Sequence, residues 1–224
     1  MTQITKVLPR SAWEHVIIQE NKEPLVHLEQ AAKLKLGGVH KQYEPLFLVR
    51  EAVAQKLYTV SARLPEGIVL VVIEGYRTMQ HQQESWDRNF KRVKEDNPDW
   101  SEEEIDKKVR LVIARPHPLA NHHCGGAIDV TLAYESGELL DMGSPYPSEA
   151  YGTDIRNKFP MFPNAFLSKV ITKEQEDNRK LLRESMEKED FVWYPGEWWH
   201  YCYGDRMWAV YSERPICFYG PIEP

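Results

Sequence analysis

The sequence is poor in cysteine and has no long apolar run. Its three cysteines among 224 residues are odd in number and lack the paired spacing of a zinc knuckle. The longest apolar run, residues 68–73, is far shorter than the about 20 residues that cross a bilayer. Residues 1–24 contain no apolar block of signal-peptide length. These absences argue against a disulfide scaffold and a membrane span, and they favour a reduced, cytoplasmic setting.

An excess of positive charge is also absent. The chain has 28 Lys and Arg against 34 Asp and Glu, which gives a formal net charge of −6. A field of this sign does not attract phosphate backbones or anionic lipids, so neither nucleic acid nor a membrane is an expected partner. Hydrophobic residues make up 42% and charged residues 28%, which is ordinary for a soluble globular protein.

Helical and extended patterns are mixed without a regular strand–helix–strand order. Helical spacing or helix-prone composition occurs at residues 44–64, 78–113 and 173–188. Extended, β-prone patterns occur at residues 68–75, 126–134 and 191–220. This mixture predicts an α+β fold with a mostly antiparallel sheet flanked by helices.

The length favours one domain that spans residues 1–224, because two full domains would each have a small core. Residues 1–45 are predicted to form an N-terminal segment. Residues 84–113 are predicted to form a helical insertion that borders the functional site, and Ser101 with Glu104 is a capping-box signature within it.

The stretch "NHHCGGAIDV", residues 121–130, combines residue types that bind metals. Asp129 lies between isoleucine and valine, where a carboxylate is costly unless a cation or hydrogen-bond donors compensate it. His122 or His123 could supply an imidazole ligand from the loop, while Asp129 supplies a carboxylate from the strand. The two glycines between them allow a sharp turn and a close backbone approach. The alternative is a structural aspartate that accepts hydrogen bonds from loop amides.

Two further stretches supply groups that a metal-dependent hydrolase needs. In "GEWWH", His200 could be a third ligand and Glu197 a general base, which leaves one metal position open. In "IEGYR", Arg77 follows a buried strand and could stabilise an oxyanion. Taken singly, each has an ordinary structural explanation: an aromatic core strand and a surface arginine on a turn.

The three stretches resemble, in order and approximate spacing, the D-alanyl-D-alanine dipeptidases of zinc peptidase family M15. Residues 120–129 fit that family's first signature, Ser-x-His-x-x-Gly-x-Ala-x-Asp, except that Ala120 replaces the serine. This register selects His122 as the ligand. "EWWHY" is similar to the second signature, Glu-x-x-His, and "GYR" to the family's Gly-Tyr-Arg. The similarity extends over roughly residues 68–203 and implies the family's α+β fold, which the Hedgehog signalling domain shares.

The resemblance implies a zinc-dependent dipeptidase that hydrolyses D-alanyl-D-alanine or a related small dipeptide. One zinc ion per chain would be held by His122, Asp129 and His200. Glu197 would then be the general base that acts on zinc-bound water, and Arg77 would stabilise the oxyanion.

Two departures from the family pattern concern the substrate. Besides Ala120, this chain has Tyr146-Pro147 where the family has an aromatic residue followed by aspartate. In the family, polar groups at these positions help bind the free amino end of the dipeptide, so their loss predicts relaxed selectivity. Tyr146 and Glu149 are the expected substrate-binding residues here, with Glu149 as the substitute acceptor.

Other functions remain open at this point. A D,D-carboxypeptidase or endopeptidase of peptidoglycan is disfavoured by the lack of an export signal. A non-haem iron oxygenase usually has its first histidine and its carboxylate one residue apart, whereas His122 and Asp129 are seven apart. A cysteine hydrolase built on Cys124 lacks a residue to orient its base. A non-catalytic metal-binding module would not need Glu197 and Arg77.

Overall fold

The computed structural model describes residues 8, 11–37, 43–110, 113–117, 121–144, 146 and 171–223. Ala120, Pro147 and Glu149, on which the substrate predictions partly depend, lie outside the described residues. Within the described part, no helix has both the length and the apolar character needed to cross a membrane.

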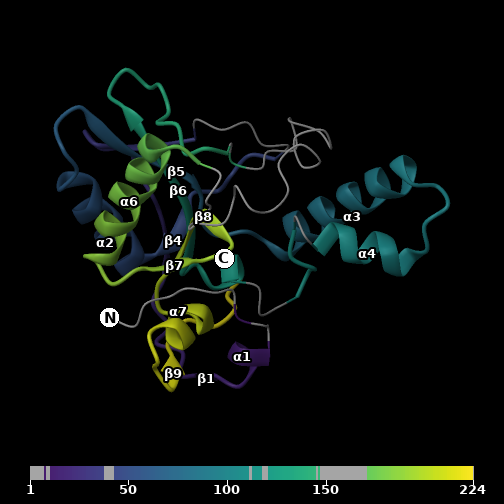
Figure 1. Cartoon of the computed structure of the whole chain (residues 1–224). Coiled ribbons are helices and arrows are strands. Elements are labelled where there is room, and N and C mark those ends of the chain that lie inside the picture. The colour runs from purple at the N-terminus through teal and green to yellow at the C-terminus, as the bar shows by residue number, and fades with distance from the viewer. Residues whose placement is uncertain are drawn as a thin grey trace.

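A five-stranded sheet forms the centre of the molecule (Figure 1). Its strands, in spatial order, are β3 (Leu34–Leu36), β5 (Ile68–Glu74), β6 (Ala127–Tyr134), β8 (Glu197–Cys202) and β7 (Val192–Tyr194). Only the β3–β5 pair is parallel, and the other three pairs are antiparallel. The predicted α+β class and mostly antiparallel sheet are therefore confirmed. The central strands β5 and β6 are buried along almost their whole length, and each has a neighbouring strand on both sides.

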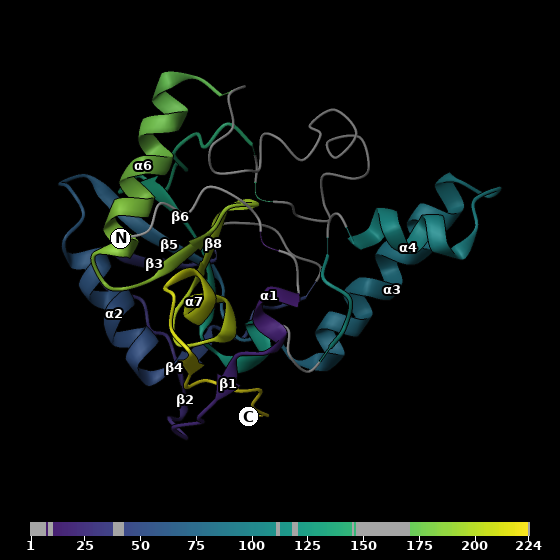
Figure 2. The ribbon, with the colours of Figure 1, turned by 60° about the horizontal axis from the view of Figure 1, so that its bottom comes forward.

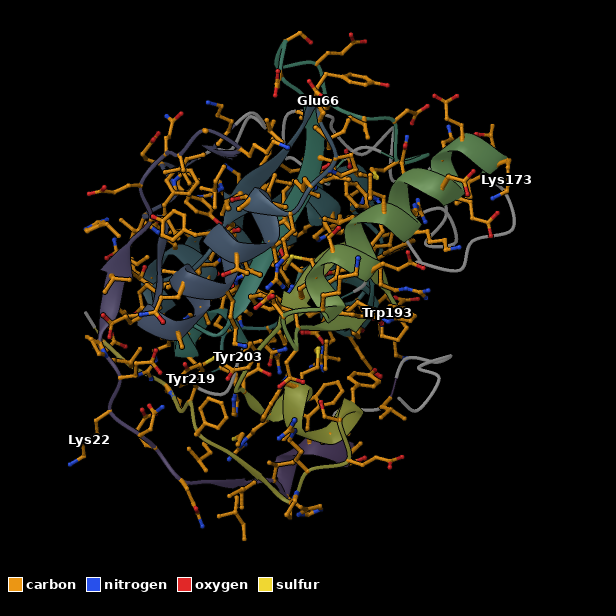
Figure 3. The ribbon with its side chains drawn as sticks, turned by 90° about the vertical axis from the view of Figure 1, so that its left-hand side faces the viewer. Lys22, Glu66, Lys173, Trp193, Tyr203 and Tyr219 are labelled. Atoms are coloured by element: carbon orange, nitrogen blue, oxygen red, sulfur yellow. The ribbon has the colours of Figure 1, made fainter. Side chains whose placement is uncertain are left out.

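Two helices lie side by side over one face of this sheet: α2 (Glu51–Ala62) and α6 (Lys173–Glu187) (Figure 3). Helix α6 begins with a capping box in which Thr172 and Gln175 exchange side-chain and backbone hydrogen bonds. Leu182 and Met186 on its inner face have no exposed surface, so α6 is anchored by the apolar stripe that its spacing predicts.

Helices α3 (Met79–Asp96) and α4 (Glu102–Arg110) form a hairpin that projects from the sheet (Figures 1 and 2). The hairpin has a small apolar core of its own, made by Trp86, Val93, Ile105 and Val109. The predicted capping box at the start of α4 is confirmed, because Ser101 and Glu104 hydrogen-bond each other through side chains and backbone. Helix α3 begins at Met79 with Thr78 as its N-cap, so a short connection joins this hairpin to the end of β5.

The remaining elements are short. They are α1 (Ser11–Glu14), β1 (Ile17–Ile18), β2 (Leu25–His27), β4 (Leu48–Arg50), the 3₁₀ turn η1 (Asn121–Cys124), α7 (Arg206–Tyr211) and β9 (Ile216–Cys217). β1 pairs with β9 and β2 with β4, so the N-terminal segment is joined to distant parts of the chain. Figure 1 shows α1, α7 and β9 together below the sheet.

Two boundary predictions were wrong. The helix predicted over residues 44–64 begins only at Glu51, because Leu48, Val49 and Arg50 pair with β2 instead. An apolar run of this length suits a buried strand as well as a helix, and the long-range backbone hydrogen bonds decide between them. The tail over residues 191–220 is not wholly extended, because Asp205 caps the short helix α7 through the backbone N–H of Trp208.

Candidate metal centre

Three acidic and imidazole side chains are aligned across neighbouring strands of the sheet. Glu74 on β5 is opposite Asp129 on β6, and Asp129 is opposite His200 on β8. Directly opposed residues in an antiparallel pair place their side chains on the same face, so the pairing alone brings the three groups together.

A β-bulge in β5 determines which residue of that strand is opposite Asp129. The regular pairing of β5 with β6 ends at Val72 with Val130, and it resumes one residue out of step at Glu74 with Asp129. Without this irregularity Ile73 would be opposite Asp129, because a one-residue shift exchanges the two faces of a strand. The bulge therefore replaces an apolar neighbour of Asp129 with a carboxylate.

His122 reaches the same place from the turn η1. Its ring nitrogen Nδ1 lies 2.7 Å from the carbonyl oxygen of Gly75. A carbonyl oxygen can only accept, so Nδ1 carries the hydrogen and Nε2 keeps a free lone pair. That Nε2 lies 3.5 Å from Oδ1 of Asp129. The ring is thus held in the tautomer and orientation that a metal ligand requires.

The two glycines between His122 and Asp129 act as the sequence predicts. Gly125 has φ of +73°, a left-handed conformation that strains other residues. Gly126 lies so close to β8 that a Cβ there would be 2.3 Å from the carbonyl oxygen of Tyr203. The turn and the close approach are both confirmed, and together they lead from the imidazole directly into β6.

The neighbouring imidazole, His123, has a different environment. It is buried, its Nδ1 hydrogen-bonds the carbonyl oxygen of Arg77, and it is not part of the cluster. Sequence alone left His122 and His123 as alternatives until the family signature was applied.

His122, Asp129 and His200 form the one cluster of potential metal ligands among the residues that the structure describes. One ligand atom from each lies within 4.8 Å of the others. His200 Nδ1 is 2.9 Å from Asp129 Oδ1, and the two imidazole rings are edge to face with centroids 5.0 Å apart. Both imidazoles therefore turn a nitrogen toward the same carboxylate oxygen.

The electrostatics of the cluster favour an ionised aspartate. Burial alone would raise the pKa of Asp129, but the adjacent imidazoles of His122 and His200 outweigh it and lower this pKa well below its usual range. A buried carboxylate with two imidazole nitrogens is a donor set that suits a divalent metal such as zinc. The residues present thus fit a metal ion.

Glu197 begins β8 and shares this environment. Burial raises the pKa of Glu197 to about 7, while the charges of His200 and Arg77 act in the opposite direction and that of Asp129 adds to the rise. A carboxylate with a pKa near neutrality is suited to take up and release protons.

Arg77 follows β5 by three residues, and its guanidinium is held by Glu74, Gln82 and Tyr43. Its Nε donates to Glu74 Oε1 at 3.0 Å, its Nη2 donates to Glu74 Oε2, and its Nη1 donates to Gln82 at 2.7 Å. Burial alone would lower the pKa of Arg77, but the Glu74 carboxylate keeps it well above its ordinary value. The arginine is therefore a fixed cation rather than a surface side chain.

Sequence reasoning missed Glu74 and Tyr43. Glu74 is 1% exposed and also accepts a hydrogen bond from the Tyr43 hydroxyl. The available signal was a glutamate that ends an otherwise apolar strand immediately before Gly-Tyr-Arg, since such a buried carboxylate needs a cationic partner.

Tyr146, predicted to bind substrate, contacts Asp129, a predicted metal ligand. Its hydroxyl donates to Asp129 Oδ2 at 2.7 Å, and its ring packs edge to face on Trp199. This contact occupies the second oxygen of Asp129 and orients the carboxylate. A contact between Tyr146 and substrate stays a prediction.

The fold and the site together define a metallopeptidase: an α+β domain with a His-Asp-His cluster, a buried glutamate and a buried arginine. The chain belongs to peptidase family M15, since the family model described as D-ala-D-ala dipeptidase matches residues 34–220. This result confirms the family that the motifs indicated.

Two relatives match most of the chain. A D-alanyl-D-alanine dipeptidase of Synechocystis sp. is 27% identical over 96% of this chain and 98% of its own length. A D-alanyl-D-alanine dipeptidase of Escherichia coli is 29% identical over 83% of this chain and 81% of its own length. Among solved structures, a vancomycin resistance D,D-pentapeptidase in complex with Zn(II) is 16% identical, with a TM-score of 0.48 and coverage of 90% of both chains.

Proposed function

We propose that the protein is a zinc-dependent dipeptidase that hydrolyses D-alanyl-D-alanine or a closely related small dipeptide. The observation that carries the proposal is the convergence of His122, Asp129 and His200, with an ionised carboxylate between two imidazoles. Membership of family M15 and the names of the two relatives support the substrate class.

The three clustered side chains would hold one zinc ion per chain. When bound, zinc lowers the pKa of a coordinated water to about 7 and polarises the peptide carbonyl. The Gly75 carbonyl orients His122 and the Tyr146 hydroxyl orients Asp129, so both side chains are positioned before any ion arrives.

Glu197 is the proposed general base and general acid. Its carboxylate accepts a proton from the attacking water and then delivers it to the amine that leaves when the peptide bond breaks. Burial keeps the pKa of Glu197 above that of an exposed glutamate, and this brings proton uptake and release closer to neutral pH.

Arg77 is proposed to stabilise the negative oxygen of the tetrahedral intermediate. The Arg77 guanidinium is a permanent cation with N–H donors in one plane, and Glu74, Gln82 and Tyr43 hold it in a fixed orientation. Because Glu74 holds Arg77 in advance, little reorganisation is needed as charge develops in the transition state.

The α3–α4 hairpin and the N-terminal segment are proposed to border this site within one domain. Gln82 of α3 contacts Arg77, and Tyr43 reaches Glu74 while its ring stacks on His81 of α3 with centroids 4.8 Å apart. Both segments thereby touch the residues around the proposed oxyanion position.

The test is hydrolysis by metal-stripped and zinc-restored protein of a panel of L,L-, L,D- and D,D-dipeptides, with a muropeptide ending in D-Ala-D-Ala beside them. We expect D-alanine release from the D,D-dipeptide, loss of activity on chelation and recovery with zinc. Cleavage of the muropeptide alone would instead assign a D,D-carboxypeptidase, and cleavage of none would reject a peptidase.

The role of Glu197 is tested by Glu197→Gln. We expect zinc content to remain at one ion per chain while kcat falls by about 100-fold to 10,000-fold. Glu187→Gln is the matched control, because burial also raises the pKa of Glu187 but this residue ends α6, away from the cluster. Equal rates for the two variants would reject the assignment.

A further inference from the structure

The second ring nitrogen of His200 has an unusual partner. Nδ1 of His200 faces Asp129 at 2.9 Å, whereas Nε2 lies 3.4 Å from the sulfur of Cys202. Among the described residues this sulfur is the hydrogen-bonding partner of Nε2. The two residues are neighbours on one face of β8, since side chains two apart along a strand point the same way.

Cys202 is enclosed in a small sulfur-lined environment. It has no exposed surface, and its Sγ lies 3.7 Å from Sδ of Met207. The side-chain amide of Asn121 is 3.7 Å from Cys202 Sγ and 3.4 Å from Met207 Sδ. The thiol hydrogen has two acceptors beside it, Met207 Sδ and the buried carboxylate of Asp205, so the lone pairs of the Cys202 sulfur are left to accept a hydrogen from elsewhere.

Binding of an ion at the Asp129 side of His200 imposes a tautomer. A ligating Nδ1 must present a lone pair, so the ring hydrogen must be on Nε2 and needs an acceptor there. Outer partners of this kind are normally carboxylates, backbone carbonyls or water. Among the residues that the structure describes, the acceptor within hydrogen-bonding distance of Nε2 is the Cys202 sulfur.

We propose that Cys202 is a positioning residue for the metal centre: its sulfur accepts the Nε2 hydrogen of His200 and holds Nδ1 toward Asp129. Cys202 is not itself a ligand, because its sulfur lies behind the imidazole and outside the His122–Asp129–His200 cluster. The inference rests on the proposed zinc site and adds a determinant of its affinity.

The experiment measures zinc affinity of the purified full chain by competition with a chromogenic chelator. Removing an outer hydrogen-bond partner of a ligating histidine typically weakens metal binding by 10- to 100-fold, so we expect at least about a tenfold loss in Cys202→Ala. Cys217→Ala is the matched control, since Cys217 is equally buried but lies on β9. We expect its affinity to equal that of the wild type.

Cys202→Ser separates hydrogen bonding from packing. A serine hydroxyl can accept from Nε2, so we expect most of the lost zinc affinity to return. If Cys202 only filled space, serine would be no better than alanine, because a buried hydroxyl adds a desolvation cost. A ¹⁵N-resolved Nε2–H resonance of His200 that shifts between the wild type and Cys202→Ser would report the same bond directly.

The outcomes distinguish this inference from the proposed function. A wild type that does not bind zinc would overturn both. A wild type that binds zinc and hydrolyses dipeptide, with Cys202→Ala and Cys217→Ala of equal affinity, would overturn the role of Cys202 alone. Failure of Cys202→Ser to exceed Cys202→Ala would also overturn it, because the effect would then be one of packing.

Discussion

Replacing Glu74 with glutamine tests the pair that holds Arg77. The Glu74 side chain is 1% exposed and that of Arg77 is 13% exposed, so neither charge is solvated if its partner is removed. Breaking a buried ion pair by removing one partner costs about 3–5 kcal/mol in the free energy of unfolding. We therefore expect that cost for Glu74→Gln and a similar cost for Arg77→Met.

The double variant provides the decisive comparison. The two single costs sum to about 6–10 kcal/mol in the free energy of unfolding. If the two side chains act as a pair, the double variant Glu74→Gln/Arg77→Met loses far less than this sum, because it buries no unpaired charge. The measurement is urea unfolding of the four proteins with equal denaturant slopes. Strictly additive costs would refute the reasoning.

An exposed pair in the same chain serves as the control. Lys180 and Glu184 are also in contact, but their side chains are 59% and 49% exposed. Solvent screens such pairs, and their contribution is about 0–1 kcal/mol. We expect Glu184→Gln to change the free energy of unfolding by no more than that.

Activity should respond to Glu74→Gln in a particular way. Glu74 is not in the proposed ligand cluster, so zinc affinity should stay close to that of the wild type, while kcat falls by about tenfold or more because Arg77 loses its fixed orientation. An unchanged kcat in a folded Glu74→Gln protein would show that Arg77 does not depend on this partner.

Three further predictions follow from single contacts. Tyr146→Phe removes the hydrogen bond to Asp129 Oδ2, so a chelator competition assay should show about tenfold weaker zinc binding. A variant with unchanged zinc affinity and a changed KM would indicate a substrate contact instead. Glu197 must be deprotonated to accept a proton, and a bound dication lowers its pKa of about 7. The pH profile of kcat should therefore fall on its acidic side, with a midpoint below pH 7. A midpoint above pH 7 would contradict this role of Glu197. Gly126→Ala places a Cβ 2.3 Å from the Tyr203 carbonyl oxygen, so it should lower the free energy of unfolding in urea by about 1–3 kcal/mol. An unchanged free energy of unfolding would show that β6 and β8 can move apart freely.

The sequence by itself determined the features that depend on local pattern. The apolar run at 68–73 forms the buried strand β5, the spacing of residues 173–188 forms α6, and Ser101 with Glu104 caps α4. These predictions succeed because strand burial, helix spacing and capping involve residues that are neighbours in the chain.

The sequence also indicated the site, through motifs of fixed spacing. Gly125 and Gly126 bring a histidine and an aspartate together across a turn, and the structure places His122 and Asp129 accordingly. That these residues and His200 bind zinc stays a prediction, as do the roles of Glu197 and Arg77. The part of the substrate prediction that concerns Glu149 lies outside the described residues.

Only the tertiary structure decided which side chains surround the site. The bulge in β5 places Glu74, rather than Ile73, opposite Asp129, and a one-residue shift of this kind leaves no periodic trace in a short strand. Tyr146 reaches Asp129 from 17 positions away, and Cys202 meets His200 because both lie on one face of β8. The same limit applies to β4, which local spacing assigned to a helix and pairing with β2 made a strand. Local pattern fixes what a segment can form, whereas partners distant in the chain select the form and the face that it presents.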